Sequence, residues 1–149
     1  MSVHPEEIAR IEGKFHADPR LIAGAMAIVT HVARRAGFAE TAAAELRIAA
    51  TEACNAFAEV LGARANSSSE IQLAASEFPG HIEVAVNFAP GEPGAGNPHD
   101  VPLKPDLAAR LREELANAPV DAMNAAIENG YPKITLIKNC RAAKRRFDL

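Results

Sequence analysis

Residues 8–37 change from a strand-like to a helix-like spacing of hydrophobic side chains. Apolar and polar side chains alternate along residues 8–16, which predicts a strand. Asp18 and Pro19 follow, and an Asp N-cap with Pro at the first helical position is typical of a helix start. Apolar residues then recur every three or four positions until Gly37, so we expect a long helix with one apolar face.

A second helical stripe comes next and is followed by a hairpin pattern. Apolar residues recur at helical spacing over residues 41–61, and a glycine directly afterwards is expected to end this helix. Many of the stripe positions are alanines, which allow neighbouring elements to approach closely. Residues 71–74 and 82–88 then alternate in polarity on either side of Pro79-Gly80. This pattern predicts two antiparallel strands joined by a tight turn.

The rest of the chain contains a long loop, a short helix and a final strand. Residues 89–104 are rich in proline and glycine, which indicates a loop. Pro105 then opens a short helix that carries leucines at intervals of four. Residues 120–128 fit either a strand or a helix, and residues 133–138 predict the last strand.

This order of elements predicts one α+β domain over residues 1–149. Two long helices precede a hairpin, a pattern typical of a two-layer α/β sandwich with a mostly antiparallel sheet and helices on one face. The core is expected to join apolar residues of the two helices to the second strand of the hairpin. These residues are Ile22, Met26, Val29, Leu46, Ala53 and Phe57 on the helices and Ile82, Val84 and Val86 on the strand.

Composition and charge narrow the classes of function. Apolar residues make up 48% of the 149 residues, and the net charge of −3 supplies no general attraction to nucleic acid or to an anionic membrane. The longest apolar run, residues 21–29, is far shorter than the roughly 20 residues that span a bilayer. No secretion signal is visible, and two cysteines are too few for a disulfide scaffold. We expect a cytoplasmic protein with no direct nucleic-acid or membrane partner, and a solvated basic tail over residues 141–149.

The second helix carries a motif. Residues 45–56 read Glu-Leu-Arg-Ile-Ala-Ala-Thr-Glu-Ala-Cys-Asn-Ala, which resembles the N-box helix of the GHKL ATPases. The resemblance is closest to the bacterial anti-sigma factor serine-protein kinases, and the order of elements extends it over residues 8–138. It implies a histidine-kinase-type ATPase fold, ATP and magnesium as cofactors, and a sigma factor or an anti-sigma antagonist as partner. It also implies a homodimer, for which the edge strand at residues 8–16 offers unpaired backbone groups.

In that family a Glu of this helix acts as general base, and an Asn four residues later ligates the magnesium of ATP. Glu52 matches the Glu, but the position four residues later is Ala56, and the nearest Asn is Asn55. Consecutive helix positions differ by about 100° in direction, so Asn55 would lie beside Glu52 in a different geometry. Because magnesium tolerates little departure from octahedral coordination, the resemblance gives Asn55 only a weakened role as metal and cofactor ligand.

Two further nucleotide contacts depart from the family pattern. The family reads adenine with an Asp after the strand that matches residues 82–86. Here Asn87 is the candidate for this contact, but it comes one position early, and Phe88 offers no acceptor. The segment that matches the phosphate loop, residues 104–111, contains no glycine. Phe88 is expected in the core, or in the space that adenine would use.

The leading interpretation is an anti-sigma-factor-like regulator whose ATP binding and serine kinase activity are weakened or lost. Two alternatives stay open: an active ATP-dependent serine-protein kinase with Glu52 as its base, and a pure interaction module without nucleotide. Glu52 and Asn55 also fit ordinary solvated helix positions, and Cys54 fits a small buried apolar residue better than a nucleophile.

Overall fold

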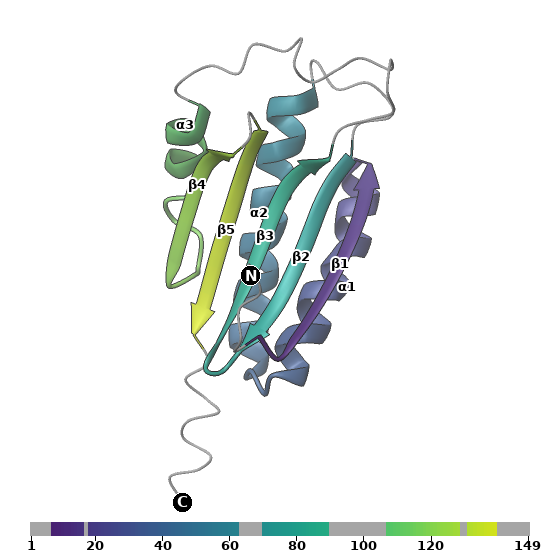
Figure 1. The fold of residues 1–149 in the computed structure, drawn as a ribbon, viewed down its shortest axis with the longest axis vertical. Coiled ribbons are helices and arrows are strands. Elements are labelled where there is room, and N and C mark those ends of the chain that lie inside the picture. The colour runs from purple at the N-terminus through teal and green to yellow at the C-terminus, as the bar shows by residue number, and fades with distance from the viewer. Residues whose placement is uncertain (1–6, 17, 63–69, 90–106, 129–130, 140–149) are drawn as a thin grey trace, which may run out of the picture.

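Five strands form a single antiparallel sheet in the computed structural model of the chain (Figure 1). The structure describes residues 7–16, 18–62, 70–89, 107–128 and 131–139. The strands are β1 (Ala9–His16), β2 (Glu70–Phe78), β3 (His81–Ala89), β4 (Ala122–Glu128) and β5 (Tyr131–Asn139). They lie in the order β1-β2-β3-β5-β4, and every neighbouring pair is antiparallel, so the predicted sheet is confirmed.

Three helices accompany the sheet: α1 (Pro19–Arg35), α2 (Glu40–Gly62) and α3 (Leu107–Glu114). The Asp18 side chain accepts a hydrogen bond of 2.8 Å from the backbone N–H of Arg20, as an N-cap does. At the other end of α1, Gly37 takes a positive φ of 86°, which a residue with a Cβ rarely adopts. The helix boundaries predicted from Asp18 and Gly37 are therefore confirmed.

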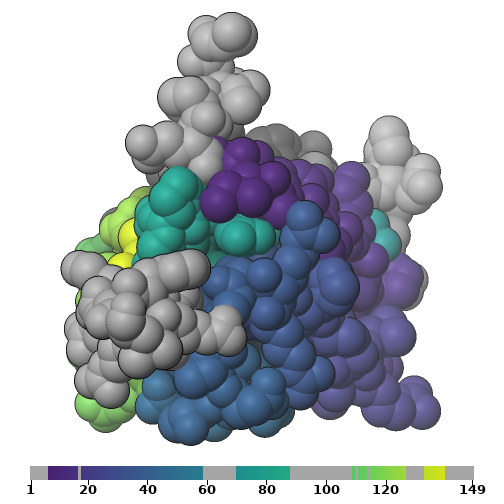
Figure 2. Space-filling view, turned by 90° about the horizontal axis from the view of Figure 1, so that it is seen from below, coloured from purple at the N-terminus to yellow at the C-terminus, as the bar shows by residue number. Residues whose placement is uncertain are grey.

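The helices cover one face of the sheet and leave the other uncovered by any described element. α1 packs over β1 and β2, α2 over β3 and β5, and α3 against β4. Figure 2, seen from below, shows the two layers: α1 and α2 in blue tones on one side, and strands in purple and teal on the other. Side chains therefore alternate along each strand between the helix-covered face and the open face.

The nine side chains predicted to form the core are all buried. They belong to one continuous cluster in which the alanine-rich face of α2 lies close to the sheet. The connection between β2 and β3 is the predicted one, since Gly80 follows Pro79 with a φ of 86°. The uncertain segment at residues 120–128 contains a strand, because β4 pairs with β5 along its whole length.

Several predicted features lie outside the described residues. These are the loop over residues 90–104, the start of the short helix at residues 105–106, the turn at residues 129–130 and the basic tail.

Replacing Val84 with alanine should lower the free energy of unfolding by about 1–3 kcal/mol, because the side chain is fully buried and a cavity would remain. Val84 lies in the middle of the central strand, opposite Ala75 on β2 and Leu136 on β5. Urea denaturation of the variant and the parent measures the difference. An unchanged unfolding midpoint would contradict the buried position of this side chain.

Candidate functional site

The candidate site lies on the exposed side of α2. Glu52 and Asn55 are both exposed there, one turn apart, and Ile48 precedes them on the same side. The opposite side of the helix is formed by buried residues such as Ala53 and Phe57. The structure thus brings the predicted base and the predicted metal ligand onto one helix face, with their side chains open to solvent.

Position 56 belongs to the other side of α2. The Ala56 side chain is only 7% exposed and forms part of the hydrophobic core. In the resembling family the magnesium-binding Asn stands four residues after the Glu, and that direction from Glu52 points here into the core. An amide side chain at position 56 would be taken out of water rather than presented to a nucleotide.

Matching the motif to Asn55 instead of Glu52 leaves the position of the general base without a suitable residue. If Asn55 is taken as the metal ligand, the residue four positions earlier is Thr51. The Thr51 hydroxyl donates a hydrogen bond of 2.8 Å to the backbone carbonyl of Arg47. A threonine hydroxyl cannot serve as a general base near neutral pH. With either assignment α2 therefore supplies one of the two expected groups at the expected spacing, but not both.

The structure separates Asn87 from these two residues. Asn87 lies opposite Gln72 on β2 and Lys133 on β5, and it alternates along β3 with the fully buried Val84 and Val86. Since these valines face the helices, Asn87 lies on the open face, with the sheet between it and α2. Glu52 and Asn55 are thus brought together, and Asn87 is not. The Phe88 side chain lies outside the described residues.

Apolar side chains fill the region where α2, α3 and the β4–β5 pair meet. Leu111 of α3 and Leu115, directly after this helix, are buried, as are Ala125 on β4 and Ile134 and Leu136 on β5. All five belong to the same core cluster as the buried side of α2. Aliphatic side chains supply neither hydrogen-bond donors nor acceptors, so these five residues offer no side-chain hydrogen bond to the polar edge of a nucleobase.

Two basic side chains that the sequence analysis did not single out link separate elements of the fold. Lys138 Nζ donates to Glu45 Oε1 at 2.9 Å and to the Pro119 carbonyl at 3.0 Å, which ties β5 to α2 and to the segment before β4. Arg112 Nη1 donates to the Ala125 carbonyl at 2.6 Å. No spacing rule would have found these contacts, because each depends on how separate elements pack.

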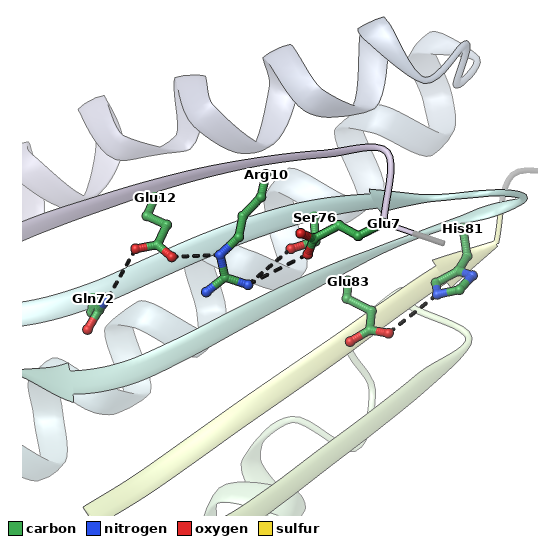
Figure 3. A network of polar contacts seen from close by, with 7 residues as sticks. All are labelled: Glu7, Arg10, Glu12, Gln72, Ser76, His81 and Glu83. Atoms are coloured by element: carbon green, nitrogen blue, oxygen red, sulfur yellow. Dashed lines mark hydrogen bonds and ion pairs between the residues drawn. The ribbon is translucent and has the colours of Figure 1, made fainter. Parts of the chain in front are cut away.

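A polar network occupies the open face of the sheet (Figure 3). Arg10 Nε lies 2.6 Å from Glu12 Oε2, and Arg10 Nη1 lies 3.4 Å from the Ser76 hydroxyl. Gln72 Nε2 donates to the other oxygen of Glu12 at 3.5 Å. The hydrogen bond and the positive charge of Arg10 lower the pKa of Glu12, so this carboxyl is negatively charged at neutral pH. The alternation of charges along residues 10–14 was the available sequence signal for this network.

Cys54 has no nucleophilic role in this setting. The side chain is buried in α2, and this burial raises the pKa of its thiol to about 12. The reactive form of cysteine is the thiolate, which is scarce at neutral pH when the pKa is so high. The interpretation of Cys54 as a small buried residue is confirmed.

The described residues contain neither a metal-binding cluster nor a helix able to span a membrane. These residues contain no group of three or more His, Cys, Asp or Glu side chains arranged to hold a metal ion. None of the described helices is long and apolar enough to cross a lipid bilayer.

Comparison with known proteins gives one positive finding. Residues 15–116, more than half of the chain, match the family model of the histidine kinase-like ATPase domain. The matched region runs from the end of β1 to the loop after α3 and includes the whole of α2. No curated protein sequence matches the chain.

Proposed function

The chain belongs to the histidine kinase-like ATPase domain family, and from this premise we propose that it is an anti-sigma-factor-like regulatory protein. In this proposal it binds a sigma factor or an anti-sigma antagonist, and its ATP binding and serine kinase activity are weakened or lost. The partner class comes from the resemblance of residues 45–56 to the N-box helix of the anti-sigma kinases. Regulation then depends on binding between proteins rather than on turnover of a nucleotide.

The burial of Ala56 is the single structural observation that supports the loss of metal and ATP binding in this proposal. Position 56 is an alanine that faces the core. Its methyl group cannot bind magnesium, and a small shift of α2 would not bring another ligand to this position. Asn55 is exposed, but it stands about 100° around the helix from that direction. Magnesium needs near-octahedral coordination, so a ligand displaced in this way binds it poorly.

ATP with magnesium is accordingly expected to bind weakly or not at all at millimolar concentration. Three contacts of the family pattern are missing, at Ala56, at Phe88 and at the glycine-free segment over residues 104–111. Each charge-assisted contact contributes about 1.5–3 kcal/mol, and about 1.4 kcal/mol corresponds to a tenfold change in affinity. Isothermal titration calorimetry of the full chain with MgATP tests this expectation. A micromolar dissociation constant would contradict it.

Isothermal titration calorimetry also tests whether the chain binds a partner of the proposed class. A purified sigma factor or anti-sigma antagonist from the same organism is titrated into the chain with and without MgATP. Binding of equal affinity in both titrations supports a regulator that no longer depends on nucleotide. If no candidate of either class binds under either condition, the partner assignment is wrong, whatever the nucleotide titration shows.

A second candidate function, an active serine-protein kinase, is favoured by one observation. Glu52 and Asn55 lie on the same exposed face of α2 at a spacing of three residues, where side chains on a helix are neighbours. In such a kinase Glu52 would take the proton of a partner serine, and Asn55 would hold magnesium in a shifted geometry. Phosphate transfer from ATP to the partner, abolished by Glu52→Gln, would establish this function in place of the first.

A further inference from the structure

Lys138 contacts two other elements of the fold with one side chain. The residue lies near the end of β5 on the helix-covered face of the sheet, opposite the fully buried Ile82. Its Nζ donates to Glu45 Oε1 of α2 at 2.9 Å and to the Pro119 carbonyl, before β4, at 3.0 Å. Because an ammonium carries three donors, it can serve both acceptors at once. The Lys138 side chain is only 14% exposed, so water is a poor substitute for either acceptor.

The Pro119 carbonyl belongs to a segment whose backbone hydrogen bonds are local. We call this segment, residues 116–120, the strap, and Figure 1 shows it as part of the green loop between α3 and β4. Its first two residues are exposed and its last three are half-buried. Ala118 N–H donates to the Leu115 carbonyl at 3.0 Å, and Val120 N–H donates to the Ala118 carbonyl at 2.8 Å. Segments with local hydrogen bonds and half-exposed side chains open more readily than the strands of a core.

The strap is fixed at both ends, and Lys138 holds its middle. Leu115, directly before the strap, is buried in the core, and Asp121 N–H, directly after it, donates to a carbonyl of β5 at 2.9 Å. Pro119 lies between these two points and accepts its hydrogen bond from a side chain of another element. Half-buried apolar residues of the strap also pack against the core. The bond from Lys138 therefore adds a polar contact where the strap is otherwise held by partly buried side chains.

The other acceptor of Lys138 can be reached from solvent. The Glu45 side chain is 43% exposed, compared with 14% for Lys138. Glu45 stands seven residues before Glu52 on α2, which is close to two helical turns, so both carboxylates lie on the same side of the helix. A cationic group that approaches this side of α2 can pair with Glu45 in place of Lys138. Lys138 would then lose the charged partner that holds its ammonium beside Pro119, since a lysine side chain is otherwise free to turn toward water.

We propose that Lys138 is a latch that keeps the strap closed, and that a basic group of a bound molecule releases it by pairing with Glu45. Binding at the exposed side of α2 is thereby coupled to the connection between α3 and β4. The closed and the open strap are the two states, and the bound cation favours the open one because it competes for Glu45. This device goes beyond the proposed regulatory function, since it requires neither nucleotide nor a particular class of partner.

Amide hydrogen exchange of the full chain, followed residue by residue by NMR, tests the latch. Lys138→Met removes the ammonium, and Glu45→Gln neutralises the carboxylate as a bound cation would. In each variant the amides of Ala118 and Val120 should exchange about tenfold or more faster than in the parent. The double variant should exchange no faster than Lys138→Met alone, because Glu45 acts on the strap only through Lys138.

Arg34→Met is the matched control, because it removes another ion pair of α2, the one from Arg34 to Glu40 at 3.1 Å, away from the strap. It should leave both strap amides at the parent's rates. Parent rates in Lys138→Met would overturn the latch, and parent rates in Glu45→Gln would overturn release through Glu45. An equal rise in Arg34→Met would show a general loss of stability and would overturn the proposal as well. If Lys138→Met does not fold, the rates in Glu45→Gln decide. None of these measurements involves ATP or a partner, so their failure is distinct from failure of the regulatory function.

Discussion

Replacing Phe57 with alanine is expected to lower the free energy of unfolding by about 3–5 kcal/mol. The ring is only 1% exposed and is the largest fully buried side chain among the described residues. It extends from α2 into the core cluster, where the other helix residues nearby are mostly alanines. Alanines are too small to move into the space that a missing ring would leave, so most of the cavity should persist.

Chemical denaturation of this variant should be compared with that of Ile48→Ala, a matched control on the same helix. Ile48 is 45% exposed, so its truncation removes less buried surface and leaves no internal cavity. We expect its effect to stay below about 1 kcal/mol. Equal losses in the two variants would mean that the orientation of α2 on the sheet is wrong.

Restoring the family's asparagine by Ala56→Asn should destabilise the protein by about 2–4 kcal/mol rather than restore ATP binding. The new amide would be buried without assured hydrogen-bond partners, and its extra volume would press on a filled core. Thermal unfolding measures the loss, and calorimetry with MgATP should show no gain in affinity.

Ala27→Asn, on the exposed side of α1, is the control for helix propensity alone and should cost about 0.5–0.7 kcal/mol. If Ala56→Asn were as stable as this control and bound MgATP more tightly than the parent, position 56 would face the nucleotide and not the core. The proposed loss of the metal site would then be wrong.

Much of the fold could be predicted because its signals are local. The Asp18 cap, the Pro79-Gly80 turn and the alternation along residues 82–88 each depend on neighbours in the sequence, and the structure contains all three as predicted. Residues 120–128 stayed ambiguous because alanines suit either type of element. Their conformation is decided by pairing with β5, which is tertiary information.

Less of the candidate site could be predicted, because a site depends on which way side chains face. The stripe of buried alanines already implied that Glu52 and Asn55 share a face of α2 and that Ala56 does not. The alternation of β3 likewise placed Asn87 away from the valines. Which face of the sheet carries the helices, and therefore which side of β3 faces α2, follows only from the packed structure.

The connectivity of the sheet also bears on the order in which its strands are expected to pair. β2 joins β3, and β4 joins β5, through two-residue connections, so these hairpins close with little loss of chain entropy. β1 reaches β2 only after both long helices have intervened in the sequence. Its pairing has the largest loop to close, and it becomes favourable once α1 is in place to cover it. We therefore expect the edge strand β1 to join the sheet after the two hairpins have formed.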